Sequence, residues 1–161
     1  MEENKDIFFM NIALKLAKRA LDRNEVPIGA VLVDQNGKIL GRGYNRVEAK
    51  KNQIEHAEII AINKACKKIA DWRLDGATLY VTLEPCIMCF GLIYISRIKR
   101  IVFGAKSEFV GSCLQILKNN EYYIKNLIIE GGLKEQESLD ILRLFFKKLR
   151  KKGKVRHEAE S

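Results

Sequence analysis

The sequence predicts an α/β fold in which a mixed five-stranded sheet lies between two layers of helices. Three observations lead to this prediction. An amphipathic segment opens the chain, two strand-like segments follow it with a tight turn between them, and strand-like and helix-like segments then alternate to the end. Alternation of this kind favours parallel pairing with helices on both faces of the sheet, whereas two strands joined by a tight turn are antiparallel.

Length and composition agree with a single domain over 1–161. The chain has 161 residues, of which 47% are hydrophobic and 30% are charged, which excludes disordered, collagen-like and disulfide-scaffold proteins. The longest uncharged apolar run extends only from Ile87 to Ile95, whereas a membrane-spanning helix needs roughly 18–20 residues. The first residues are acidic, unlike those of a secretory signal peptide. We therefore expect a cytoplasmic protein with reduced cysteines.

The opening of the chain predicts a helix followed by a hairpin. Apolar side chains recur at helical spacing from Met10 to Leu21, with Lys and Arg on the other side, which predicts an amphipathic helix over 5–23. The dipeptide Asn36-Gly37 is a strong hairpin signal. The two hairpin strands are expected over 27–33 and 38–44.

The rest of the chain alternates between helices and strands. Ile59, Ile62 and Cys66 recur at helical spacing and predict a helix over 56–70. The segment 77–83 is apolar on both faces, as a central strand should be. The remaining elements expected are a helix over 86–94, a strand over 100–104, a short helix near 112–118, a strand over 127–129 and a long basic helix from about 135.

The net charge of the chain is concentrated near its C-terminus. The formal net charge is +9, and most of it comes from 143–161. Two interpretations fit this segment, a solvated tail that aids solubility or a docking surface for a polyanion. The basic residues of the segment are Arg143, Lys147, Lys148, Arg150, Lys151, Lys152, Lys154 and Arg156.

Two short clusters, each at the start of a predicted helix, carry the chemistry. They are His56-Ala57-Glu58 and Pro85-Cys86-Ile87-Met88-Cys89. Cys86 and Cys89 share one helix face, where the positive end of the helix dipole favours their thiolates. With His56 they make three protein ligands, which leave a coordination position for water, whereas structural zinc is normally closed by four. The clusters predict a catalytic zinc site in which Glu58 moves the protons of the water.

Each part of this site also has a plainer interpretation. A histidine at a helix start is often a cap or a packing residue, and Cys-x-x-Cys can be a redox pair or half of a structural zinc site. No thioredoxin-like context surrounds the two cysteines, and no fourth ligand has comparable spacing. Cys66 lies on the apolar stripe of its helix and Cys113 next to a loop, so we interpret both as ordinary core or surface residues.

Taken together, His-x-Glu followed by Pro-Cys-x-x-Cys is the known zinc signature of the cytidine deaminase superfamily, which this chain resembles. Within it, the flanking residues are similar to those of bacterial tRNA-specific adenosine deaminases over about residues 5–150. The resemblance implies a cytidine deaminase-like fold, one Zn²⁺ ion per subunit, a homodimer, and deamination of adenosine to inosine at the wobble position of a tRNA anticodon loop. The similar stretches are Glu25-Val26-Pro27-Ile28-Gly29-Ala30-Val31, Asn45-Arg46, 77–86 and 96–105.

The resemblance also implies roles for residues around the metal. The backbone N–H of Ala57 and the side chain of Asn45 are expected to hold the base or ribose, and Val26 and Pro27 to form a pocket wall. The basic helix is expected to contact tRNA phosphates through Lys147, Lys148, Arg150, Lys151 and Lys152. Of the adjacent Phe145 and Phe146, at least one is expected to face the core.

The chain departs from this family at one loop, and other functions stay open. Ser107 stands where most members carry an aspartate, so either Glu108 takes over the interaction with the neighbouring nucleotide or that interaction is absent. The alternative function is a free nucleobase or nucleoside deaminase acting on guanine or cytosine, which has no use for the basic tail. A third hypothesis is an inactive zinc-stabilised RNA-binding or scaffold protein, and Glu58 counts against it because a structural site needs no such carboxylate.

Overall fold

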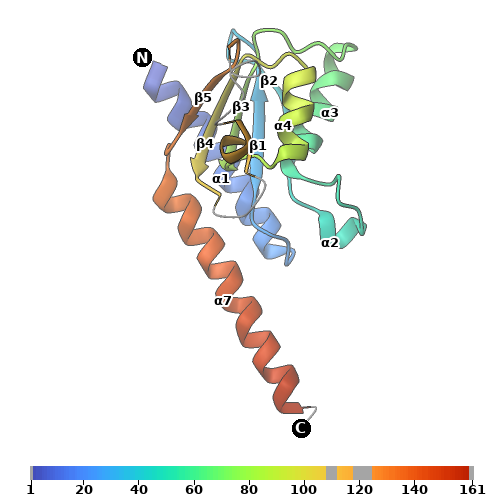
Figure 1. Ribbon diagram of the computed structural model, residues 1–161, viewed down its shortest axis with the longest axis vertical. Helices are drawn as coiled ribbons and strands as arrows, with labels where there is room; N and C mark the ends of the chain where they lie inside the picture. Colours follow the sequence, from blue (N-terminus) through green and yellow to red (C-terminus); the bar gives the residue numbers. More distant parts are fainter. Residues whose placement is uncertain (1, 108–111, 118–124, 160–161) are drawn as a thin grey trace.

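A five-stranded sheet lies between two layers of helices in the computed structural model, which describes residues 2–107, 112–117 and 125–159 (Figure 1). The strand order is β2-β1-β3-β4-β5. β1 pairs antiparallel with β2 and β3, whereas β3, β4 and β5 are parallel. The predicted mixed α/β sheet is confirmed. The strands are β1 (Gly29–Val33), β2 (Ile39–Tyr44), β3 (Thr78–Leu83), β4 (Arg100–Ala105) and β5 (Ile128–Gly131).

The helices of the described residues lie close to the predicted positions, with one addition. The short helix α2 is not predicted by the sequence, and it follows directly after the hairpin. None of these helices combines the length and the apolar character needed to span a membrane, in the part of the chain that the structure describes. The helices are α1 (Glu2–Asp22), α2 (Val47–Lys50), α3 (Ala57–Ile69), α4 (Ile87–Ile95), α5 (Cys113–Leu117) and α7 (Glu135–Ala159).

The opening hairpin forms at the predicted dipeptide. Gly37 has a φ of 80°, a backbone conformation that glycine adopts without steric cost. The Asp34 carboxylate accepts hydrogen bonds from the backbone N–H groups of Asn36 and Lys38, both at 2.9 Å. The turn therefore satisfies its own backbone donors and fixes the register of β1 against β2.

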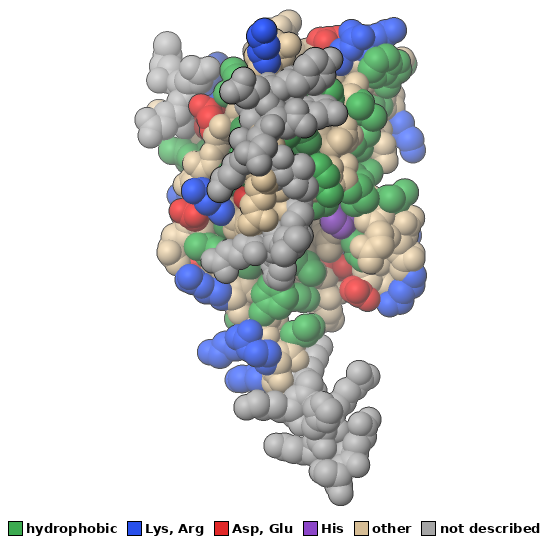
Figure 2. All heavy atoms as spheres, viewed as in Figure 1, with side chains coloured by type: hydrophobic (Ala, Val, Ile, Leu, Met, Phe, Trp, Pro, Cys, Tyr) green, Lys and Arg blue, Asp and Glu red, His purple; other side chains and the backbone are tan. Residues whose placement is uncertain are grey.

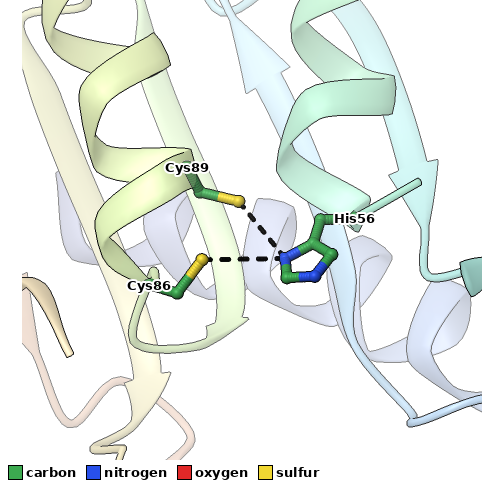
Figure 3. Close-up of side chains that lie close together, drawn as sticks. All are labelled: His56, Cys86 and Cys89. Carbon is green, nitrogen blue, oxygen red and sulfur yellow. Dashed lines mark hydrogen bonds between the residues drawn. The ribbon is translucent and has the colours of Figure 1, made fainter. Parts of the chain in front are cut away.

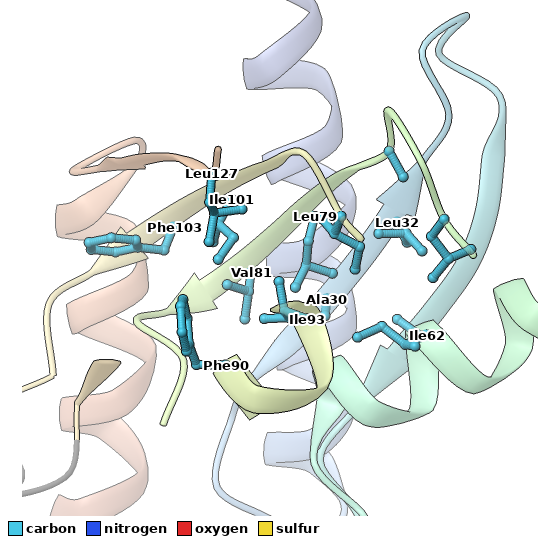
Figure 4. Close-up of a cluster of buried hydrophobic side chains, with 14 of the residues drawn as sticks. Ala30, Leu32, Ile62, Leu79, Val81, Phe90, Ile93, Ile101, Phe103 and Leu127 are labelled. Carbon is cyan, nitrogen blue, oxygen red and sulfur yellow. The ribbon is translucent and has the colours of Figure 1, made fainter. Parts of the chain in front are cut away.

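Each face of the sheet buries its own hydrophobic cluster. On one face α1 and α7 cover the strands, and Met10 and Ala13 of α1 pack with Val31, Tyr80 and Val102 of the sheet. On the other face α3 and α4 cover a larger cluster, part of which is drawn in Figure 4. Burial of apolar area on both faces is the main stabilising contribution of such a three-layer fold. Prominent buried members of the larger cluster are Leu32, Ile62, Leu79, Phe90, Ile93 and Phe103.

Two glycines in β2 bring α3 very close to the sheet. A Cβ atom at Gly43 would lie 2.0 Å from the carbonyl oxygen of Ala57, and one at Gly41 would lie 2.0 Å from that of Ala61. Any side chain at these positions would push the helix away, so glycine is required for the close approach. The packing fixes the first turn of α3, and with it His56, relative to the strands.

An ionic network stabilises the end of the sheet at which β3 and β4 begin. Asp6 of α1 accepts hydrogen bonds from Arg100 of β4 and from the hydroxyl of Tyr80 in β3. Arg100 also pairs with Glu130 of β5. The network links α1 to β3, β4 and β5 near the N-terminal ends of β3 and β4. It therefore lies at the opposite end of these two strands from their C-terminal residues.

Candidate active site

The predicted metal ligands come together where α3 and α4 begin. His56 is the N-cap residue of α3 and Cys86 is that of α4, while Cys89 lies in the first turn of α4. The Nδ1 atom of His56 lies 3.8 Å from Cys86 Sγ and 3.4 Å from Cys89 Sγ, and Figure 3 shows both sulfurs facing the same side of the imidazole. The three ligand atoms lie within 4.8 Å of one another. Among the described residues this is the one group of three or more such side chains with that geometry.

The position of the cluster at two helix ends follows from backbone geometry. The first N–H groups of a helix have no partner within the helix, and the helix dipole places partial positive charge there. Neither His56 nor Cys86 uses its side chain to cap its helix. Both side chains therefore point toward each other instead, and the interpretation of His56 as a simple cap is wrong.

The titration of the cluster reflects its crowding. The hydrogen bond with Cys89 lowers the pKa of the Cys86 thiol to about 4, with His56 adding to the same effect. The same contact raises the pKa of Cys89, and the hydrogen bond with Cys86 raises the pKa of His56. The pattern is that of one thiolate that is hydrogen-bonded to a neighbouring thiol and to an imidazole. Metal binding displaces the protons shared in these hydrogen bonds, because thiolate and neutral imidazole are the forms that bind a metal.

Glu58 lies beside the cluster and is almost completely buried, with 3% of its surface exposed. Burial raises the pKa of its carboxyl group, and its charge acts on both His56 and Cys89. Its Oε2 atom has no hydrogen-bond partner among the described residues. A buried polar atom without a partner is costly, so it marks a position where a further polar group is expected.

The three converging side chains fit a zinc ion. Two sulfurs and one imidazole nitrogen are a donor set that zinc prefers, and three protein ligands leave a position for water or substrate. The unpartnered oxygen of Glu58 supplies a hydrogen-bond acceptor for such a water. The donor set and the orphaned carboxylate both fit a catalytic zinc site with His56, Cys86 and Cys89 as ligands.

Three of the other four predicted pocket residues are buried. Ala57 is buried in the first turn of α3. Asn45 is 4% exposed at the end of β2, and its backbone N–H donates to the carbonyl of Ile28. Pro27 is buried on the same segment, while Val26 is half-buried. The structure thus brings the segment 26–28 against Asn45, and the roles of these residues toward a substrate stay predictions.

Val26 also lines a groove that leads along α7. The groove has a volume of about 340 Å³ and lies between the ends of the strands and the helix. Arg143, Phe146 and Arg150 line its α7 side. Lys106 and Ser107 follow β4 and line the opposite side, whereas Glu108 lies outside the described residues.

One of the predicted RNA-binding residues lines this groove, and three others lie on the exposed surface of α7 outside it. Arg150 lines the groove, whereas Lys147, Lys148 and Lys151 are exposed on α7, and the side chain of Lys152 lies outside the described part. Lys and Arg side chains gather on α7 where the helix leaves the body of the molecule (Figure 2). Phe145 is buried and Phe146 is half-buried, which confirms that at least one of the pair faces the core.

Sequence reasoning missed two buried glutamates that each accept backbone N–H groups from a distant segment of the chain. Glu25 is 1% exposed and accepts the backbone N–H groups of Glu48 and Ala49 in α2. Glu84 is 5% exposed and accepts those of Ser107 and Leu114. Each precedes a proline by one or two residues, and a charged residue in such a place was the available signal.

The two remaining cysteines lie apart from the metal cluster, as expected. Cys66 packs against the larger hydrophobic cluster, and Cys113 is completely buried. Burial, together with the neighbouring Glu84, raises the pKa of the Cys113 thiol to about 12. All four cysteines are free thiols.

Known proteins resemble the chain in both sequence and fold. The profile of the cytidine and deoxycytidylate deaminase zinc-binding region matches residues 3–105. A tRNA-specific adenosine deaminase of Bacillus subtilis is 44% identical over 154 residues, which cover 94% of this chain and 94% of the relative. A solved structure from work on A-to-I editing by tRNA:A34 deaminases at the wobble position is 40% identical, with a TM-score of 0.76, over 84% of this chain and 99% of that one.

A guanine deaminase from Nitrosomonas europaea shares the fold. Its solved structure superposes with a TM-score of 0.72 over 85% of this chain and 82% of its own, at 24% identity. Likeness at that level of identity shows the architecture alone, so this structure does not favour guanine as the substrate.

Proposed function

The chain belongs to the family of cytidine and deoxycytidylate deaminase zinc-binding proteins, and from this premise we propose that it hydrolyses adenosine to inosine at the wobble position of a tRNA anticodon loop. The observation that carries the proposal is the buried carboxylate of Glu58, which has an unpartnered oxygen beside three converging metal ligands. A purely structural metal site has no use for such a group. The relatives named tRNA-specific adenosine deaminase supply the substrate class.

The reaction replaces the amino group at C6 of adenine by oxygen. When bound to His56, Cys86 and Cys89, zinc supplies Lewis acidity that lowers the pKa of water from about 15.7 to about 7. Glu58 accepts a proton from the attacking water and passes it to N1 of the base as the C6–O bond forms. It then carries the remaining hydroxyl proton to the amino group, the C6–N bond breaks, and ammonia leaves.

The burial of Glu58 suits this exchange of protons. Burial raises the pKa of the carboxyl group, so the Glu58 carboxylate takes up a proton more readily than an exposed glutamate does. The backbone N–H of Ala57 and the buried side chain of Asn45 hold the base or ribose beside it, and Val26 and Pro27 form one wall of the pocket.

The groove along α7 suits a single-stranded loop of RNA. A base in an anticodon loop leaves its stack at a cost of at most a few kcal/mol, far less than a base in a duplex. Phe146 offers a partly exposed aromatic ring, and Arg143, Arg150 and Lys106 offer positive charge in the same groove. Stacking surfaces combined with cationic side chains are typical of proteins that bind single-stranded RNA.

The exposed lysines of α7 extend this positive surface. Lys147, Lys148 and Lys151 contact phosphates further along the RNA, with Arg150 in the groove and Lys152 beyond them. A free nucleobase has no phosphates and would gain nothing from these contacts. The basic helix therefore favours tRNA over guanine or cytosine as the substrate.

The enzyme acts as a homodimer that pairs through α4. The outer side of this helix exposes Ile87, Met88 and Ile95, of which Ile95 is 64% exposed, and hydrophobic side chains gather over α4 in Figure 2. A Cβ atom at Gly91 would have no neighbour within 4 Å, so a second backbone can approach closely there. An apolar patch without charged members suits a second copy of the same patch around a two-fold axis.

The free thiols of the site fit a reducing compartment. Cys86 and Cys89 must stay reduced to hold a metal, and cytosolic thiol systems keep cysteines in that state. We accordingly place the enzyme in the cytoplasm, where tRNA is modified.

A panel of substrates tests the proposed function. The zinc-loaded protein is incubated with a tRNA carrying adenosine at the wobble position, with the matching anticodon stem-loop, and with free adenosine, guanine and cytosine. We expect ammonia release from the tRNA and the stem-loop alone. Consumption of guanine or cytosine without reaction of the RNA would establish the alternative activity instead.

A further inference from the structure

We propose that Glu84 is a positioning residue that holds the wall of the RNA groove opposite α7. The inference rests on the proposed function, because the groove is the place where the RNA substrate binds. It starts from a buried carboxylate that the proton-transfer mechanism does not use. Glu84 lies between the last residue of β3 and the Pro85-Cys86 pair, so it separates the sheet from a metal ligand.

The carboxylate of Glu84 bridges two segments of chain. Its Oε2 atom accepts the backbone N–H of Ser107 at 3.0 Å, and its Oε1 atom accepts that of Leu114 at 2.9 Å. The Sγ atom of Cys113 lies 3.8 Å from Oε1. One side chain thus holds both ends of the connection between β4 and α5.

In the part of the chain that the structure describes, backbone N–H groups compensate this carboxylate and no cation does so. No lysine, arginine or histidine side chain of the described residues forms an ion pair with Glu84. A carboxylate that is 5% exposed is costly to bury unless its oxygens are satisfied, and hydrogen bonds to a charged acceptor are stronger than those between neutral groups. Its two N–H contacts are therefore firm constraints on Ser107 and Leu114.

One of the two residues that Glu84 anchors, Ser107, lines the groove, whereas Leu114 does not. Ser107 and its neighbour Lys106 line it, facing Phe146 and Arg150 of α7. If Ser107 moved, the width of the groove and the position of the Lys106 charge would change together. Glu84 thereby acts on the fit of the RNA, whereas Glu58 acts on the protons at the reacting base.

Backbone contacts also hold the chain around Glu84, so we expect the metal ligand to stay in place when the side chain is changed. The Glu84 N–H donates to the carbonyl of Ala105 at 2.8 Å, and the Pro85 carbonyl accepts the N–H of Cys113 at 3.1 Å. Cys86 also forms a bridge with Ser112. These backbone contacts do not use the carboxylate, so we expect the metal cluster to stay intact in the variants below.

Two variants and two kinds of measurement test the proposal. Glu84→Ala removes both acceptors, whereas Glu84→Gln keeps one and is nearly the same size. We expect the amide hydrogens of Ser107 and Leu114 to exchange faster in Glu84→Ala, and one of the two to do so in Glu84→Gln. For the anticodon stem-loop, loss of a hydrogen bond to a charged acceptor predicts a KM raised roughly tenfold or more in Glu84→Ala and less in Glu84→Gln. The kcat and the zinc content stay close to those of the parent.

Asp6→Asn is the matched control. It removes a partly buried carboxylate near the start of β4, where Asp6 pairs with Arg100. Asp6 does not line the groove, so we expect lower stability and an unchanged groove. We expect its KM to equal that of the parent. If Glu84→Gln lowered kcat or zinc content and left KM unchanged, or if the two amides exchanged at the parental rate in both variants, the proposal would be wrong.

The outcome for Glu84 is separable from that for the proposed function. A zinc-loaded parent that deaminates no RNA would refute the function, and with it the role of Glu84 in substrate fit. The exchange rates of Ser107 and Leu114 would still show whether the carboxylate anchors them. An active parent with unchanged KM in both variants would refute the role of Glu84 alone.

Discussion

His56 Nδ1 lies 3.4 Å from Cys89 Sγ, although 33 residues separate the two along the chain. Each lies at the start of a helix, and the two helices cover the same face of the sheet. Close packing of Gly41 and Gly43 against α3 sets one helix, and the Pro85-Cys86 turn after β3 sets the other. The metal site is thus a consequence of how two helices dock on one sheet.

Removal of a ligand should abolish metal binding. Cys86→Ala leaves one sulfur and one imidazole, which is too few donors for a stable zinc site. We expect zinc content, measured by elemental analysis of the purified protein, to fall to background together with activity. Cys66→Ala, a change to a half-buried cysteine outside the cluster, should retain the metal. A Cys86→Ala protein with a full complement of zinc would show that the ligand set is wrong.

Loss of the Glu58 carboxylate should separate binding from turnover. Glu58→Gln has nearly the same shape and cannot carry the protons, so we expect a rate lower by roughly 10²–10⁴-fold. Zinc content and affinity for RNA should stay unchanged. Glu55→Gln is a nearby control, because Glu55 forms a partly buried ion pair with Arg46 and lies outside the proton path. Equal turnover by Glu58→Gln and the parent would refute the proton shuttle.

Charge reversal on α7 should weaken RNA binding in a salt-dependent way. Removing one lysine–phosphate ion pair reduces the slope of log affinity against log salt by about 0.7 for a single strand. We expect Lys151→Glu with Lys152→Glu to lower the affinity and flatten this slope, measured by fluorescence anisotropy with an anticodon stem-loop. Lys67→Glu reverses an exposed charge on α3 and should leave the slope unchanged. A slope equal to that of the parent in the double variant would support the solvated-tail interpretation.

The ion pair between Asp6 and Arg100 should make the stability of the fold depend on pH. The hydrogen bonds from Arg100 hold the pKa of Asp6 below its ordinary value. Its contribution is therefore present above the pKa of an unfolded aspartate, about 3.9, and is lost as the pH falls below that value. Asp6→Asn should lower the free energy of unfolding by about 2 kcal/mol near neutral pH.

The difference between Asp6→Asn and the parent should shrink at about pH 3, because the unfolded parent chain takes up a proton below the ordinary aspartate pKa of about 3.9, whereas the lowered pKa of Asp6 makes the folded parent bind it less readily. Urea denaturation at the two pH values measures this change. Asp71→Asn removes an exposed aspartate that pairs with Arg73, and it should have no measurable effect. A gap between Asp6→Asn and the parent that widened in acid would contradict the sign of the effect.

A charge on the outer face of α4 should separate the subunits. Ile95→Lys places an ammonium group within the proposed interface, where burial without a partner is costly. We expect light scattering to report a dimer for the parent and a monomer for this variant. Ile128→Lys introduces the same charge at an isoleucine of β5 that is 47% exposed, and it should remain dimeric. A parental protein that is monomeric throughout would rule out the α4 interface.

Much of the fold was predictable because its signals are local. The Asn36-Gly37 turn, the helical spacing of Ile59 and Ile62 and the two-sided apolar strand at 78–83 each depend on neighbours in sequence. The metal ligands were predictable for the same reason, since each cluster is short and begins a helix. Sequence spacing and helix geometry together specify which side chains can meet.

The features that were missed depend on partners far away in the chain. α2 has four residues and no capping side chain of its own, and the carboxylate of Glu25 satisfies its first N–H groups from more than twenty residues upstream. The contacts of Glu84 with Ser107 and Leu114 span 23 and 30 residues. No local sequence pattern predicts such contacts. The donors to these two carboxylates are backbone N–H groups, which every residue except proline carries.

The most direct test of the central claim is a mass measurement on the RNA. A tRNA with adenosine at the wobble position is treated with zinc-loaded protein, digested with a nuclease, and its fragments are analysed by mass spectrometry. We predict that inosine replaces adenosine at that one position, with an equal amount of ammonia released. Fragments of unchanged mass after treatment with the zinc-loaded protein would contradict the proposed deamination.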